Sequence, residues 1–270
     1  MAVNISRDSH PQIARSRDHQ IIELSARRVL VPLRRGNSWP VIADTAAGPF
    51  VIKLRGAAHG TAALVAEILV AGIAERIGLQ VPARALVLCA DDLRSDDRND
   101  ELAQLLSASR GLNLGFQFLQ DAHDLRPQDA GQIDDETAVR ILWLDWLTMN
   151  PDRTDRNPNI LMSFGRPWLI DHGSALGFHY TWAAVTEASP LKPFPLTTHV
   201  LRTRADRIAG MHETLRSQLS RDAIRAAVAA VPDDFLQTMR PEDSGQAALF
   251  RRREAYVAFL WKRVRKAQIG

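Results

Sequence analysis

Residues 150–173 read NPDRTDRNPNILMSFGRPWLIDHG, and they decide how the fold of the chain is interpreted. The stretch begins with a turn-rich segment and continues through two short apolar runs, ILMSF at 160–164 and WLI at 168–170. A Gly-Arg-Pro turn separates the two runs, and this pattern is typical of a tight hairpin. The second run leads directly into Asp171, so the hairpin brings this residue beside the segment that precedes the first run.

Polar residues lie on both sides of this predicted hairpin. Asp152 begins the loop, Asn157 and Asn159 follow it, and Asp171 ends the second strand. Phosphoryl transfer needs a carboxylate that orients the attacking hydroxyl and accepts its proton, together with an Asn and an Asp that hold Mg²⁺. The pattern meets this need. Asp and Asn are also common turn residues without any chemistry, so the interpretation depends on the rest of the chain.

A lysine and a glutamate in the first part of the chain point to the same chemistry. Of the 34 cationic side chains only four are lysines, and one of these, Lys53, lies in the apolar run PFVIKL. Glu67 follows on the next predicted helix. A strand Lys paired with a helix Glu holds nucleotide phosphates in protein kinases. Taken alone, the two residues fit equally a surface lysine at a strand edge and a solvated glutamate.

Composition restricts the class of protein. The chain has 270 residues, 46% apolar and 24% charged, as in ordinary globular proteins; this excludes wholesale disorder and favours one large domain or two close lobes. The net charge of +3 argues against a dedicated nucleic-acid-binding protein. A single cysteine, Cys89, excludes an intramolecular disulfide.

Membrane and secretion signals are not expected. The longest apolar stretch, 61–74, includes Glu67 and is shorter than the ~20 residues that a membrane span needs. The first residues do not follow the signal-peptide pattern. We therefore expect a cytoplasmic protein without a membrane partner.

The periodicity of apolar residues predicts an α+β, two-lobed layout. Residues 1–20 are polar and without a period, which predicts a loose, disordered tail. Residues 21–122 form the expected small β-rich lobe, in which short strands up to Leu54 make an antiparallel meander. Residues 123–270 form the expected larger helical lobe.

Finer expectations follow from the same patterns. In the first lobe we expect a helix after residue 61 that ends at Gly78, a strand at 81–88, a variable surface connection at 91–110 and a strand at 114–119. In the second lobe we expect helices at 134–149, 203–217, 221–231 and 247–266. The arginine run Arg251–Arg253 predicts a solvated face of the last helix.

Two pairs of segments resemble the HipA-like kinase family, bacterial relatives of the protein-kinase and phosphatidylinositol-kinase fold. The first pair is WLDWLTMNPDRTDRNPNIL at 143–161 and RPWLIDHGSALGFHYTW at 166–182. The second pair, PFVIKLRG at 49–56 and ALVAEILVAGIAERIGLQVP at 63–82, resembles the family's Lys-bearing strand and Glu-bearing helix. The resemblance covers roughly residues 30–182. It implies a two-lobed kinase fold and an ATP- and Mg²⁺-dependent phosphotransferase whose best-known acceptors are serine and threonine residues of proteins.

The resemblance also implies roles for individual residues. Lys53 would contact the ATP phosphates, and Glu67 would position Lys53. Asp152 would be the catalytic base, and Asp171 the principal Mg²⁺ ligand.

Two of these assignments have competitors. Spacing from Asp152 favours Asn157 as the second metal ligand, at the usual fifth position after the base, whereas context favours Asn159, immediately before the strand; both are kept. Asp155 competes with Asp152 as the base, but Asp152 heads the Asp-Arg pair that the resemblance identifies.

The nucleotide-binding loop departs from the kinase pattern. No G-x-G-x-x-G occurs between the first strands, where the turn is RRGNS at 34–38. Backbone amides of such a turn can still cradle a phosphate, which makes Gly36 and Ser38 candidate ATP-binding residues.

Three functions therefore compete. The first is a kinase that binds ATP and phosphorylates a Ser or Thr hydroxyl of an unidentified protein acceptor. A kinase for a small molecule or an inositol lipid would use the same chemistry. The third is a pseudokinase that works as a nucleotide-binding scaffold.

Overall fold

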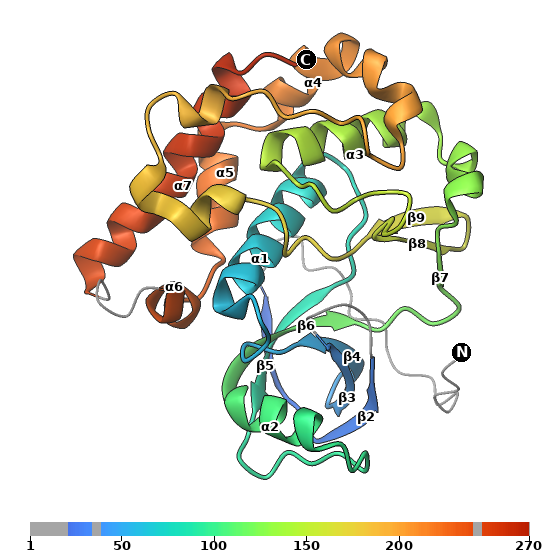
Figure 1. The fold of residues 1–270 in the computed structure, drawn as a ribbon, viewed down its shortest axis with the longest axis vertical. Helices are drawn as coiled ribbons and strands as arrows, with labels where there is room; N and C mark the ends of the chain where they lie inside the picture. Colours follow the sequence, from blue (N-terminus) through green and yellow to red (C-terminus); the bar gives the residue numbers. More distant parts are fainter. Residues whose placement is uncertain (1–20, 34–38, 240–244, 270) are drawn as a thin grey trace. The chain divides into compact units, whose positions relative to one another are not determined.

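The computed structural model describes residues 21–33, 39–239 and 245–269, which form two compact units (Figure 1). One unit comprises the described part of Met1–Ala57 together with Ala83–Phe118. The other comprises Ala58–Pro82 and the described part of Leu119–Gly270. The expected tail at 1–20 lies outside the described residues. The helix expected after residue 61 was assigned to the 21–122 lobe, but its contacts place it in the second unit.

A six-stranded sheet builds the first unit, in the order β1-β5-β6-β4-β3-β2. Its strands are β1 (Ile22–Ser25), β2 (Arg28–Pro32), β3 (Val41–Thr45), β4 (Gly48–Lys53), β5 (Arg84–Cys89) and β6 (Gly111–Gln117). Strands β2, β3 and β4 form the expected antiparallel meander. The meander does not include β1, which pairs in parallel with β5 in the register Ile22↔Ala85. Alternation of apolar residues reveals a strand and its buried face but not its partner, so this expectation was wrong for β1.

The connection expected at 91–110 contains a helix, α2 (Asp100–Ala108). Asn99 caps it, because its side chain accepts a hydrogen bond from the amide of Leu102 at 3.0 Å. Leu102 and Leu106, four residues apart, join the apolar core of this unit with Phe50. Leu105 packs against the same core. The many Asp and Arg residues around α2 obscured this short apolar face in the sequence.

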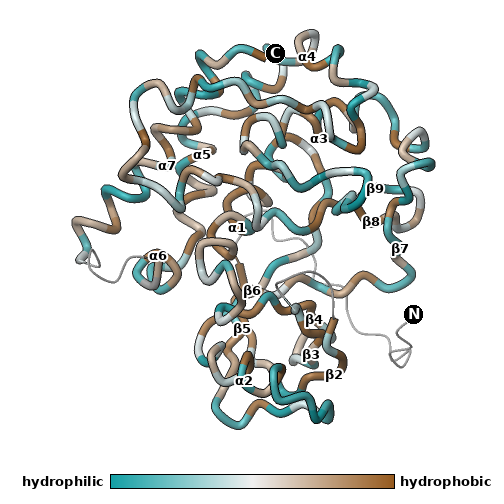
Figure 2. Tube along the Cα trace, in the orientation of Figure 1, coloured by the Kyte–Doolittle hydropathy of each residue, from teal (hydrophilic) through white to brown (hydrophobic). Residues whose placement is uncertain are grey.

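Helices dominate the second unit. They are α1 (Gly60–Arg76), α3 (Asp135–Thr148), α4 (Ile208–Gln218), α5 (Arg221–Ala229), α6 (Asp233–Met239) and α7 (Gln246–Lys266), with 3-10 segments η2 (Pro127–Gln132), η3 (Gly177–Ala184), η4 (Ser189–Leu191) and η5 (Arg202–Arg207). Helix α1 packs against α3, α5 and α6. It is buried almost all round, Glu67 included, and Figure 2 shows its apolar stretch in brown. Among the described residues, none of the helices combines the length and apolar character that crossing a membrane requires.

A small three-stranded sheet, β7 (His123–Asp124), β8 (Ile160–Ser163) and β9 (Arg166–Leu169), lies in the same unit. The β8–β9 hairpin was predicted, but its turn is Phe164-Gly165 and not Gly-Arg-Pro. Both turn residues have positive φ, 49° and 71°, as a two-residue hairpin turn requires. Arg166 and Pro167 belong to β9 because they pair with Ser163 and Met162.

The arginine run of α7 is mostly tied to the protein and not solvated. Arg252 is buried and donates to the carbonyl of Leu236. Arg253 donates to the carbonyl of Val231 and pairs with Asp233 at 2.7 Å. The expectation of a solvated face was wrong for these two residues, because the chain before and within α6 leaves carbonyls that need donors.

Arg263 of α7 fastens this helix to the end of α3. Its guanidinium is fully buried and donates to the carbonyls of Trp146, Pro190 and Lys192, at 2.9 to 3.0 Å. It also lies 4.8 Å above the Trp146 ring, a cation–π distance. Burial lowers the pKa of Arg263 to about 10, so the side chain stays charged at neutral pH.

Replacing Arg263 with Met should lower the free energy of unfolding by about 2–4 kcal/mol, because buried carbonyls then lose their donors. Urea unfolding measures the change. Arg265→Met, two residues later on an exposed position, is the matched control and should cost much less. Equal losses in the two variants would contradict this docking role.

Candidate active site

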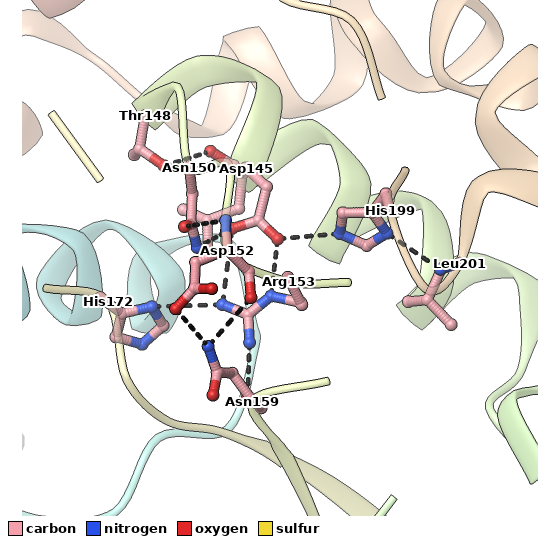
Figure 3. A network of polar contacts seen from close by, with 10 residues as sticks. Asp145, Thr148, Asn150, Asp152, Arg153, Asn159, His172, His199 and Leu201 are labelled. Carbon is pink, nitrogen blue, oxygen red and sulfur yellow. Dashed lines mark hydrogen bonds and ion pairs between the residues drawn. The ribbon is translucent and has the colours of Figure 1, made fainter. Parts of the chain in front are cut away.

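A buried ion pair lies at the centre of the loop that follows α3 (Figure 3). Arg153 Nε donates to Asp145 Oδ2 at 2.6 Å, and both side chains are fully buried. Burial by itself would raise the pKa of Asp145, but the charge of Arg153 and the hydrogen bond from His199 outweigh this effect and hold the pKa well below its usual range. Asp145 is therefore ionised at neutral pH.

The same guanidinium holds both segments that carry the predicted metal ligands. Arg153 Nη1 donates to the backbone carbonyl of Asn159, and Nη2 lies 3.3 Å from His172 Nδ1. Since arginine only donates, the His172 nitrogen is the acceptor. One buried side chain thus connects the start of β8 with the residue after Asp171.

A second branch runs from Asp145 to the backbone of Asp152. Asn150 Nδ2 donates to Asp145 Oδ1 at 3.0 Å, and Asn150 Oδ1 accepts the backbone N–H of Asp152 at 3.1 Å. Met149, at the end of α3, has the left-handed conformation that turns the chain into this loop. The position of Asp152 is therefore fixed from α3.

Both candidate asparagines donate hydrogen bonds to the carboxylate of Asp152. Asn157 Nδ2 donates to its Oδ2 at 2.9 Å, and Asn159 Nδ2 approaches the same oxygen at 3.3 Å. Across the described residues no hydrogen bond is directed at Oδ1. Asp155, the competing base, instead pairs with Arg202 at 2.9 Å, and both side chains are exposed. Asp152 is thus a half-buried carboxylate whose Oδ2 accepts hydrogen bonds from both asparagines, whereas its Oδ1 is available to a further donor.

Asn159 and Asp171 lie at the same end of the β8–β9 hairpin. The amide of Ile170 donates to the Asn159 carbonyl at 3.1 Å, one residue beyond the last strand pair. Both residues have positive φ, 50° and 55°, which Asn and Asp adopt more easily than other side chains but at some cost. The hairpin thus brings together the pair that the sequence predicted.

The chemistry of this pair suits a hard cation. Because Asn159 Nδ2 is directed at Asp152, its Oδ1 points the other way, as Figure 3 shows. An amide oxygen and a carboxylate are the ligand types that Mg²⁺ takes. Within the described ranges, His, Cys, Asp and Glu side chains do not gather in groups of three that could hold a metal. Asn159 and Asp171 are the residues at this site that could hold a cation.

Residues 199–202, which we call the clasp, pack against the back of this loop. The amide of Val200 donates to the Arg153 carbonyl at 3.0 Å, and His199 Nε2 lies 2.9 Å from Asp145 Oδ2. The amide of Leu201 donates to His199 Nδ1 at 2.9 Å. Because Nδ1 accepts, the imidazole proton is on Nε2, which donates to Asp145.

The remaining predicted site residues lie elsewhere. Glu67 is buried on α1, and its Oε1 would lie 3.3 Å from a Cβ on Gly173, so this glycine lets the segment after Asp171 approach α1 closely. Lys53 ends β4 in the first unit, and its pairing with Glu67 stays a prediction. Gly36 and Ser38 lie outside the described residues.

Sequence reasoning missed the residues that support the site. Asp145 gives one usable signal: it is a charge inside the apolar run WLDWL, and a buried charge needs a partner. Arg153 was noted only as part of an Asp-Arg pair. His199 gives no signal, because it lies 54 residues from Asp145 in a segment without periodicity.

Asp145→Asn keeps the shape of the side chain but leaves Arg153 buried without its countercharge. We expect the free energy of unfolding to fall by about 3–5 kcal/mol at pH 7, because breaking a buried pair exposes the cost of burying a charge. Urea unfolding tests this. Asp155→Asn, which breaks an exposed pair with Arg202, should have little effect on stability, and a comparable loss there would contradict the assignment.

The same pair predicts a pH dependence. The folded-state pKa of Asp145 lies below the value of about 3.9 in an unfolded chain. Its contribution to stability is therefore complete above about pH 4 and is lost as the pH falls further. The stability difference between wild type and Asp145→Asn should shrink in urea titrations as the pH is lowered from about 4 to about 2. A constant difference over this range would show that the Asp145 charge is not involved.

The model of the HipA-like kinase family matches residues 27–252. No match was found among the curated proteins. Among solved structures, the chain is similar to the crystal structure of a Helicobacter pylori proinflammatory kinase, CtkA, with 11% identity, a TM-score of 0.46, and coverage of 91% of this chain and 96% of that chain. Since the family match spans most of the sequence and includes every element of the loop and hairpin, the chain belongs to the HipA-like kinase family.

Proposed function

We propose that this protein uses ATP and Mg²⁺ to phosphorylate a Ser or Thr hydroxyl of a protein acceptor. Membership of a kinase family supports the reaction type. The observation that carries the proposal is the arrangement of Asp152, Asn159 and Asp171, since a proton acceptor beside an Asn–Asp pair is what phosphoryl transfer requires.

Asp152 acts as the catalytic base in this proposal. The amides of Asn157 and Asn159 hold its Oδ2, which leaves Oδ1 to accept the hydroxyl proton of the acceptor. Holding one oxygen fixes the direction of the other, and orientation of a base contributes directly to rate.

Asn159 and Asp171 are the residues that would hold Mg²⁺. When bound, the ion would neutralise charge on the phosphate oxygens of ATP. Asn159 fits this role better than Asn157, because Asn159 is buried and its backbone is held by Arg153, whereas Asn157 is exposed. Asn157 then acts only as a donor to Asp152.

Lys53, Gly36 and Ser38 complete the proposal on the nucleotide side. Lys53 would contact the ATP phosphates, with Glu67 positioning it, and the amides of the 34–38 turn would cradle a phosphate. The acceptor would bind by contacts that these residues do not determine. Small molecules and inositol lipids are therefore tested beside protein acceptors.

Asp152→Asn should reduce phosphoryl transfer by at least about a thousandfold, because the amide cannot accept the hydroxyl proton, although it keeps the shape of the side chain. Transfer from radiolabelled ATP to the protein itself, to protein acceptors and to inositol lipids measures the rate. EDTA should abolish transfer by wild type. Asp155→Asn is the matched control, three residues later in the same loop, and should keep nearly full activity.

The opposite pattern, with Asp155→Asn inactive and Asp152→Asn active, would move the base to Asp155. Transfer only to a small molecule or a lipid would change the acceptor class. ATP binding by wild type without transfer to any acceptor would favour the pseudokinase scaffold.

A further inference from the structure

The clasp, residues 199–202, contacts the loop that contains Asp152 at three successive residues, 153–155. The amide of Val200 bonds the carbonyl of Arg153, residues Thr154 and His199 form an isolated antiparallel bridge, and Arg202 pairs with Asp155. These contacts differ in burial. Arg202 and Asp155 are exposed, whereas His199 is only 3% exposed and reaches into the interior.

His199 completes the set of donors around Asp145. Oδ1 of this carboxylate accepts from Asn150, and Oδ2 accepts from both Arg153 Nε and His199 Nε2. Asn150 and Arg153 of the loop after α3 and His199 of the clasp together fix the plane of the carboxylate. The acceptor role of His199 Nδ1 towards Leu201 in turn fixes the ring, so the proton on Nε2 can only point at Asp145.

The orientation of the Asp145 carboxylate determines the positions of Asp152 and Asn159. Oδ1 accepts a hydrogen bond from Asn150, which in turn accepts the backbone N–H of Asp152. Oδ2 accepts from Arg153 Nε, and Arg153 Nη1 donates to the carbonyl of Asn159. Asn159 has a left-handed backbone, which persists only where its surroundings enforce it. A rotated Asp145 would therefore loosen the proposed base and the proposed metal ligand together.

We propose that His199 is a positioning residue for phosphoryl transfer, which acts through Asp145 and Arg153 on Asp152 and Asn159 without touching ATP or the acceptor. This inference rests on the proposed function. It predicts a defect confined to turnover and to the Mg²⁺-dependent part of nucleotide binding, because the first unit with Lys53 is untouched.

Two substitutions separate the two hydrogen bonds of His199. In His199→Asn, the amide oxygen can still accept from the Leu201 N–H, which preserves the turn, but the side chain is too short to donate to Asp145. In His199→Gln, the longer amide restores a donor near the position of Nε2. Arg202→Gln is the control in the same clasp, since it removes the exposed pair with Asp155 and the hydrogen bond to the His199 carbonyl but leaves the imidazole of His199 in place.

The measurements are the kcat and KM of ATP-dependent transfer, ATP affinity by calorimetry with Mg²⁺ and with EDTA, and Tm. For His199→Asn we expect kcat to fall about 10- to 100-fold, as for misplaced catalytic groups, and the gain in ATP affinity from Mg²⁺ to shrink. Affinity in EDTA should stay as in wild type. His199→Gln should recover most of the kcat, and Arg202→Gln should differ from wild type by less than about threefold.

Three results would overturn the inference. Wild-type kcat in His199→Asn would show that the donor to Asp145 is dispensable. An equal loss of kcat in the Asn and Gln variants, in step with a lower Tm, would reduce His199 to a structural role. Wild-type protein that binds ATP but transfers no phosphate, or binds no ATP, would overturn the proposed function itself, and the positioning role would fall with it.

Discussion

The site depends on the burial of one guanidinium. Arg153 has no access to water, so each of its N–H groups must find an acceptor inside the protein. The acceptors come from the carboxylate of Asp145 on α3, the carbonyl of Asn159 before β8 and the ring of His172 after β9. Satisfying this one side chain therefore gathers three segments that are separate in sequence. Because an unpaired buried charge costs free energy, each segment is held where it can accept a hydrogen bond from Arg153.

Backbone strain at the hairpin end follows from this arrangement. Asn159 and Asp171 both have left-handed backbones at the end of β8–β9, and the Phe164-Gly165 turn fixes the register that sets them side by side. Such conformations cost free energy and persist where hydrogen bonds enforce them. Here Arg153 and the amide of Ile170 both bond the Asn159 carbonyl. These hydrogen bonds hold Asn159, a proposed metal ligand, beside Asp152, the proposed base.

Sequence reasoning predicted the hairpin but missed a short helix and two contacts between distant segments. The hairpin was predicted because a short turn joins two apolar runs, and the Asn–Asp juxtaposition follows from that hairpin. The parallel pairing of β1 with β5 was missed, since it joins residues about sixty positions apart. Helix α2 was missed because its core-facing residues, Leu102, Leu105 and Leu106, form a short apolar face and charged residues surround them. His199 was missed because its partner, Asp145, is equally remote.

The sequence alone determined the family and the α+β class, because residue type and short-range spacing specify these; the roles of the predicted site residues stay predictions. Spacing and context pointed to different asparagines, Asn157 and Asn159, and Asp155 competed with Asp152, which the resemblance favoured as the base. In the structure these candidates differ in burial and in partners: Asn159 is buried and its carbonyl accepts from Arg153, whereas Asp155 pairs with an exposed arginine. The physical reason is that the burial of Arg153 and Asp145 depends on contacts across the whole unit, and burial determines which polar groups must be paired.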